Sequence, residues 1–192
     1  MKDTNEKLFG MLIKCACEAG AYKASVITTD LISADRSFRD MCAQNRCGMY
    51  GRCYMCPPDV GDIDQLMGRI RDYSFALVYQ TVTELEDSYD FEGMVAAREK
   101  LPHITLSIKE TFERLDISSS LHLSAGGCGV CGSAGCAKLT NEPCRHPDKA
   151  LPSLEAYGIN VSKLASSSGM KYVNGQNTVT YFGASLFNIR RL

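Results

Sequence analysis

The sequence lacks both a long apolar run and an extended basic block. A membrane span needs roughly 18 consecutive apolar residues. The 45% of hydrophobic residues in this chain are instead interspersed with 22% of charged residues, and the formal net charge is only -1. We therefore expect neither a membrane nor a nucleic acid as a partner. The first residues, MKDTNEKLF, are polar and unlike a secretory signal peptide, so we expect a protein of the reducing cytoplasm, in an organism living without oxygen.

Familiar catalytic motifs are also missing. The chain has no G-x-S-x-G turn, no P-loop, no H-E-x-x-H pair, and no G-x-G-x-x-G after a predicted strand. Hydrolase, nucleotide-dependent and dehydrogenase activities therefore have no support from motifs, and whether the protein is an enzyme stays open.

Cysteine is the residue that the chain has in excess. Ten cysteines occur in 192 residues, and eight of them form two groups of four in the loops 42–58 and 126–147. A thiolate is a soft ligand, and four thiolates on a short loop can surround one metal centre at little cost in loop entropy. The candidate metal ligands are Cys42, Cys47, Cys53 and Cys56 in the first group, and Cys128, Cys131, Cys136 and Cys144 in the second.

Three other uses of these cysteines have less support. A disulfide framework is disfavoured because a chain of this length buries roughly 70% of its unfolded surface without covalent links. A redox dithiol in each C-x2-C pair would leave the remaining clustered cysteines unexplained. A zinc ribbon places its two pairs about 15–20 residues apart, whereas 71 residues separate Cys56 from Cys128. Two separate zinc sites remain an alternative.

An iron-sulfur centre suits the surroundings of the cysteines better than zinc does. Glycine allows backbone amides to turn toward a bound cluster, and amide hydrogen bonds to sulfur stabilise an anionic cluster. Five glycines lie around the second group: Gly126, Gly127, Gly129, Gly132 and Gly135. Cys56 is followed by proline, as is the last cysteine of bacterial ferredoxin motifs. We therefore expect two [4Fe-4S] clusters, with zinc as the alternative cofactor.

The pattern of apolar residues predicts one α/β domain over 1–192, with a small mixed sheet flanked by helices. In the first helix we expect Leu8, Met11, Leu12 and Cys15 to share the buried face. Pro102 is expected to interrupt or kink the helix over 91–115. A brief helix is expected after Asp35. We expect helices over 5–19, 62–72, 91–115 and 152–157, and strands over 24–29, 74–82, 119–123 and 178–187.

Residues outside the two groups give weaker signals. Cys15 and Cys17 point in different directions on the first helix and are interpreted as core cysteines. Glu155 is compatible with simple helix-start chemistry and is given no role. Four basic side chains either offset the charge of thiolate-bound clusters or are solvated surface residues: Arg46, Arg52, Lys138 and Arg145.

Two stretches resemble the signature blocks of the domain of unknown function 2284 family. They are CAQNRCGMYGRCYMCPPDVG from Cys42 and AGGCGVCGSAGCAKLTNEPCRHPDKALPSLEAYGINV from Ala125. The resemblance covers most of the chain and implies a cysteine-bound metal centre of iron-sulfur type, in a family found largely in anaerobic bacteria and archaea. It implies no particular reaction.

The resemblance also bears on the ligands of the first site. The family pattern matches Cys42, Cys47 and Cys56, whereas other residues are usual at the position of Cys53. The first site has either four cysteine ligands or three, and three would leave one iron open to water, substrate or a sulfur atom as a Lewis acid.

These observations favour an iron-sulfur protein that acts in electron transfer or redox chemistry with a redox protein as partner. One alternative is a structural or interaction module stabilised by zinc, since metal binding can supply folding free energy. Another is an enzyme that uses an open iron on a three-cysteine cluster. The sequence does not predict an oligomeric state.

Overall fold

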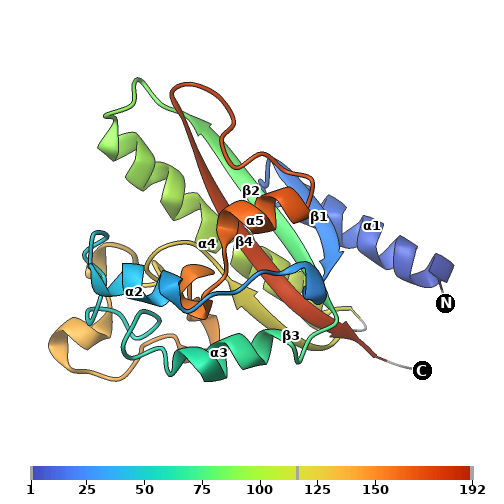
Figure 1. Cartoon of the computed structure of the whole chain (residues 1–192), viewed down its shortest axis with the longest axis horizontal. Coiled ribbons are helices and arrows are strands. Elements are labelled where there is room, and N and C mark those ends of the chain that lie inside the picture. Colours follow the sequence, from blue (N-terminus) through green and yellow to red (C-terminus); the bar gives the residue numbers. More distant parts are fainter. Residues whose placement is uncertain (1, 116, 191–192) are drawn as a thin grey trace.

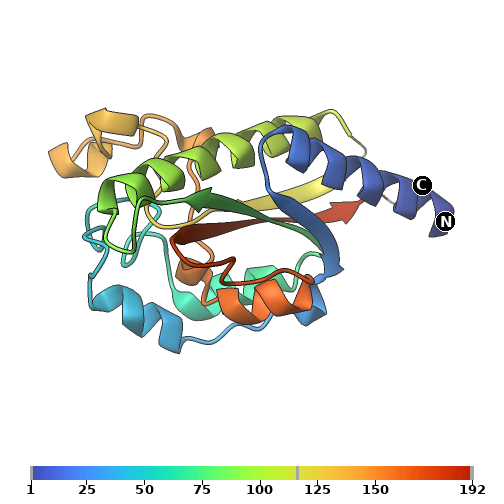
Figure 2. The same ribbon diagram turned by 90° about the horizontal axis from the view of Figure 1, so that it is seen from above.

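The computed structural model describes residues 2–115 and 117–190, with a four-stranded sheet between two layers of helices (Figures 1 and 2). The strand order is β1-β2-β4-β3, and neighbouring strands are antiparallel throughout. The strands are β1 Lys23–Thr28, β2 Phe75–Glu84, β3 Ile117–Leu123 and β4 Thr178–Ile189.

The α/β class is confirmed, but the sheet is antiparallel where a mixed sheet was expected. Alternation of helices and strands usually signals parallel crossovers. Here Thr28, at the end of β1, pairs with Phe75, at the start of β2. The segment 29–74 is therefore a long excursion from a hairpin, and it returns the chain beside the point where it left.

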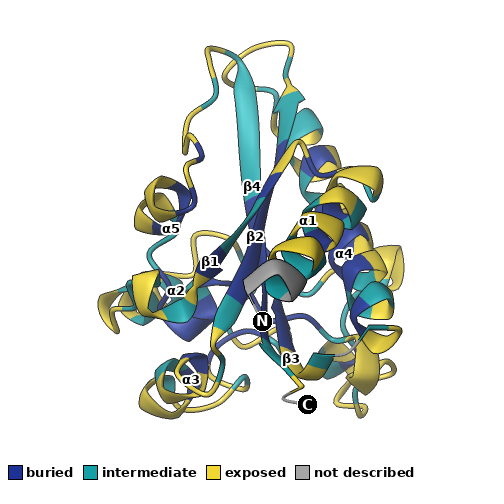
Figure 3. Ribbon diagram, turned by 90° about the vertical axis from the view of Figure 1, so that its right-hand side faces the viewer, coloured by how far each residue is buried: buried dark blue, intermediate teal, exposed yellow. Residues whose placement is uncertain are grey.

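The sheet separates two hydrophobic cores. Alternate side chains of a strand point to opposite faces, so Ala76 and Val78 of β2 pack on one side while Leu77 and Tyr79 pack on the other. The first core is covered by α3 Ile63–Ile70 and α5 Val161–Ser167, and the second by α1 Lys2–Glu18 and α4 Phe91–Glu113 (Figures 2 and 3). Each fully buried large apolar side chain contributes about 1.5–3 kcal/mol.

In α1 the buried face differs slightly from the expected one. Leu12 and Ala16 are buried and Leu8 packs beside them, a spacing of four residues that follows the helical repeat. Met11 was expected on the same face but is 41% exposed. The face of α1 that packs on the sheet therefore contains Leu12 and Ala16 and is turned away from Met11.

Pro102 does not divide α4, so the expected interruption is wrong. The helix runs from Phe91 to Glu113 with Pro102 inside it. A proline inside a helix costs about 3 kcal/mol, because it removes one amide donor and crowds the preceding turn. Leu101, Ile104 and Ile108 are buried in the second core, and at about 1.5–3 kcal/mol each their burial outweighs that cost.

The predicted helix over 152–157 is reduced to one 3-10 turn, η5 Glu155–Tyr157. Its upstream backbone pairs with the end of β3 instead: the Ser124 amide donates to the Pro152 carbonyl (2.9 Å), and the Leu154 amide donates to the Ser124 carbonyl (3.0 Å). Gly158 ends the turn at φ 72°, where a Cβ would lie 3.0 Å from the Asp35 carbonyl oxygen. The helix α5 was not expected; the Asn160 side chain caps it.

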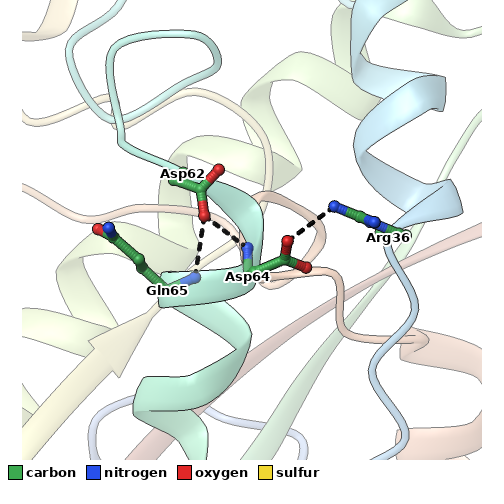
Figure 4. A network of polar contacts seen from close by, with 4 residues as sticks. All are labelled: Arg36, Asp62, Asp64 and Gln65. Carbon is green, nitrogen blue, oxygen red and sulfur yellow. Dashed lines mark hydrogen bonds and ion pairs between the residues drawn. The ribbon is translucent and has the colours of Figure 1, made fainter.

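Two short helices flank the first cysteine loop. The brief helix expected after Asp35 is α2, Ser37–Ala43, and α3 begins at Asp62, whose carboxylate accepts from the amides of Asp64 and Gln65 (Figure 4). Such a cap contributes about 1 kcal/mol. Arg36 forms an ion pair with Asp64 at 2.8 Å, but both side chains are 65% exposed, so the pair adds little to stability.

Among the described residues, no helix combines the length and the apolar character that a bilayer crossing requires.

His122 of β3 is a buried titratable group within the sheet. Its Nδ1 lies 2.8 Å from the Ser185 hydroxyl and its Nε2 lies 3.0 Å from the Ser120 hydroxyl, while its ring packs against Phe112. Burial, assisted by the charge of Lys109, lowers the pKa of His122 to about 4. The folded protein therefore favours the neutral imidazole.

We expect His122→Gln to reduce the loss of stability on acidification. Unfolded histidine titrates near pH 6.5, so below that pH the unfolded chain binds a proton that the folded chain takes up only near pH 4. Between pH 7 and pH 5 the free energy of unfolding of the natural protein should fall by about 2 kcal/mol more than that of the variant. Urea denaturation at the two pH values measures this difference, and parallel losses would contradict it.

Candidate metal centre

The two cysteine loops lie side by side at one end of the sheet (Figures 1 and 2). The Tyr54 hydroxyl donates to the Glu142 carbonyl at 2.8 Å. Lys138 forms an ion pair with Asp59, and its ammonium lies 5.3 Å from the centre of the Tyr54 ring. Groups far apart in sequence thus form one cysteine-rich region, which local spacing alone could not establish.

The first loop begins inside a helix. Cys42 belongs to α2, which was expected only to lead into the group. Cys47 is exposed, whereas Cys53 and Cys56 are buried and belong to one turn, in which the Cys56 amide donates to the Cys53 carbonyl at 3.0 Å. This first group therefore extends from the surface into the interior.

The second loop leaves the end of β3 and contains only 3-10 turns, Gly132–Ala134 and Ala137–Thr140. Its four cysteines are half-buried free thiols. The Leu151 amide donates to the Cys128 sulfur at 3.3 Å, and the Val130 amide also points to it. Gly129, at φ 73°, precedes Val130. The amides that reach this sulfur are therefore not those of glycines, although one glycine lies at the adjoining turn.

The clustered cysteines line two cavities. The first cavity has a volume of about 280 Å³, and its walls include Cys42, Cys47 and Cys56. The second, of about 450 Å³, is lined by all four cysteines of the second group, and Cys47 and Cys53 also reach it. Cys47 therefore borders both cavities.

Cys53 lies between the two groups. Its sulfur accepts hydrogen bonds from the Cys56 thiol, the backbone amides of Cys128 and Met55, and the Cys136 thiol, and these lower the pKa of Cys53 to about 5. As the donor in this pair, Cys56 has a raised pKa. The sulfur of Cys53 thus contacts the second group while its backbone belongs to the first.

The other perturbed thiols are disfavoured as anions. Burial raises the pKa of Cys42, and the nearby charge of Glu155 raises it further. Burial also raises the pKa of Cys128. Buried thiolates become favourable when a cation lies among them, so the donor set suits a positively charged metal centre.

No three histidine, cysteine, aspartate or glutamate side chains of the described residues converge closely enough to hold a single metal ion. The cysteines surround cavities instead of one point. An iron-sulfur cluster contains several irons and inorganic sulfides, and its four cysteines stand around this larger body.

The basic side chains beside the cysteines have different partners. Arg46 lines the first cavity and Arg52 the second. Lys138 forms its ion pair with Asp59, and Arg145 donates to the Gly135 carbonyl at 3.2 Å. At least two of the four therefore stabilise the loops themselves.

Glu155 is a candidate site residue that the sequence interpretation missed. It lines the first cavity with the three cysteines, and it is half-buried. Burial raises the pKa of Glu155, and hydrogen bonds from its own backbone amide and from the Ser153 side chain partly offset that shift. The only hint in the sequence was that Glu155 lies within the second family block. No local spacing in the sequence links Glu155 to Cys42.

Cys15 and Cys17 lie in α1, at the opposite end of the molecule from the loops (Figure 1). Cys15 is half-buried and Cys17 is exposed, so the expectation of a core cysteine is wrong for Cys17. The second core takes its buried contacts from Leu12 and Ala16 of this helix, which turns Cys17 to solvent.

We expect the double variant Cys15→Ser/Cys17→Ser to bind as much metal per chain as the natural protein, because neither side chain lines a cysteine cavity. Elemental analysis of the protein purified without oxygen measures this. Cys131→Ser is the matched comparison and should bind less metal. A loss in the double variant would place α1 within the metal site.

The comparisons with known proteins give one match. The family model described as "Predicted metal-binding protein (DUF2284)" matches residues 25–187, which include both cysteine groups. Neither a curated protein nor a solved structure matches the chain. A match over most of the chain shows that this protein belongs to the DUF2284 family of predicted metal-binding proteins.

Proposed function

We propose that this protein binds two [4Fe-4S] clusters and transfers single electrons between redox partners in a reducing cytoplasm. The observation that carries the proposal is the meeting of the two cysteine groups at Cys53, which shares a turn with Cys56 of its own group and lines the cavity of the second group beside Cys136. Two centres that share such a contact lie close enough to exchange electrons. A redox protein is the expected partner.

The ligands follow from the two cavities. We assign the second cluster to the four cysteines of the second group and the first cluster to Cys42, Cys47 and Cys56. Cysteine thiolates are the usual ligands of such clusters. Cys53 then lies between the clusters and can help tune them through its hydrogen bonds.

The surroundings of the second cavity support an anionic cluster. The amides of Leu151 and Val130 point to the Cys128 sulfur, and hydrogen bonds of this kind stabilise the reduced state and tune the potential. Arg52 lines the same cavity and adds positive charge. The cluster itself would supply the one-electron chemistry.

The first cavity favours a second candidate function, that of an enzyme. With three cysteine ligands, one iron of its cluster can bind a substrate as a Lewis acid. The walls also carry apolar side chains, among them Phe38, Met41 and Tyr50, which would limit the access of water. Electron delivery from the second cluster would serve such a reaction equally well.

We expect protein purified without oxygen to contain roughly eight iron and eight acid-labile sulfide per chain, as two four-iron clusters require. The preparation should also show reversible one-electron reduction. Metal and sulfide analysis with a redox titration tests both points. A colourless protein that binds zinc without sulfide would instead indicate a structural module.

We expect Cys53→Ser to retain both clusters, because neither proposed ligand set includes Cys53. Cys56→Ser should lose the first cluster, at a cost of roughly four iron per chain, and Cys136→Ser should lose the second. Iron analysis and absorption spectra of the three variants measure this. If Cys53→Ser lost about four iron, Cys53 would be a ligand.

A further inference from the structure

The first cavity holds three cysteines of the first group and a carboxylate, that of Glu155. Cys53, the fourth cysteine of the group, does not line this cavity and directs its sulfur toward the second group. A four-iron cluster offers four irons for ligation. A protein ligand to the fourth iron would therefore come from outside the first group of cysteines.

The turn that contains Glu155 is attached to the helix that contains Cys42. Arg39 of α2 donates to the Ala156 carbonyl at 3.2 Å and to the Gly61 carbonyl at 3.0 Å. The Ser153 hydroxyl accepts from the Ala156 amide at 3.1 Å, and its side chain also bonds the Glu155 carboxylate. These contacts hold the carboxylate at the cavity wall.

Glu155 lies close to a second acidic group, the thiol of Cys42. Among the described residues Glu155 forms no ion pair, and its negative charge raises the pKa of the Cys42 thiol. The charge of Arg39 opposes that of Glu155 at Cys42, but its guanidinium donates to backbone carbonyls and makes no ion pair with Glu155. Arg46, which also lines the cavity, is exposed. A half-buried carboxylate facing a thiolate is stable when both bind a metal.

We propose that the Glu155 carboxylate is the fourth ligand of the cluster held by Cys42, Cys47 and Cys56. This inference rests on the proposed function, since it requires a cluster at the first site. Carboxylate oxygen is a harder ligand than thiolate and leaves one iron chemically distinct from the other three. A substrate or partner group can displace it more readily than it can displace a cysteine.

Mössbauer spectroscopy of ⁵⁷Fe-enriched protein tests the assignment without any activity assay. In the natural protein, about one iron in eight should show the parameters of oxygen ligation. Glu155→Gln keeps the size of the side chain and removes the carboxylate, so the distinct iron should change its parameters. On mild oxidation it should be released, giving the electron paramagnetic resonance signal of a three-iron cluster at about one per chain.

Two further variants control for indirect effects. Glu142→Gln removes a carboxylate from the second cysteine loop and should leave the distinct iron unchanged. Glu155→Cys offers a thiolate at the same position and should give a cluster without a distinct iron at unchanged iron content. If Glu155→Gln does not fold, Glu155→Cys by itself still tests the assignment.

The outcomes separate this inference from the proposed function. Two clusters with a spectrum that is unchanged in Glu155→Gln and Glu155→Cys would overturn the role of Glu155 and leave the iron-sulfur function standing. A natural protein in which all irons have sulfur ligation alone would do the same and point to Cys53. Protein without sulfide would overturn both.

Discussion

A single short pairing of backbone segments determines where the candidate site lies. Ser124, just beyond β3, pairs in parallel with Ser153 through hydrogen bonds to Pro152 and Leu154. This pairing closes the second cysteine loop at its base, because the chain leaves the sheet after Ser124 and returns beside it. It also places η5 against α2. The same two hydrogen bonds therefore fix the positions of the second group of cysteines and of Glu155 at the wall of the first cavity.

The elements that sequence could predict are those whose signal is local. Apolar runs predicted the strands near 24–29, 74–82, 119–123 and 178–187, all within a few residues of β1 to β4. The errors arose where distant contacts decide the conformation. The core packing of Leu101 and its neighbours keeps α4 continuous through Pro102, and the bridge between Ser153 and Ser124 keeps the start of the predicted helix over 152–157 out of a helix.

The candidate site, like the fold, could be predicted only where its signal is local in the sequence. Residue type and spacing identified the eight clustered cysteines as candidate ligands, because metal chemistry requires soft donors in groups. The contact of Cys53 with Cys136 and the position of Glu155 beside Cys42 depend on how two loops and a turn meet in space. No period or spacing in the sequence encodes such a meeting, so these parts of the site could not be predicted from the sequence.

The excursion of residues 29–74 from the β1–β2 hairpin has a consequence for how this site can change over time. The Thr29 amide bonds the Ser74 carbonyl at 3.1 Å, next to the paired residues Thr28 and Phe75. Because both ends of the excursion are fixed to the sheet, adding residues to it costs only a slowly growing loop entropy. The first cysteine loop can therefore gain, lose or exchange ligands while the register of the sheet stays the same.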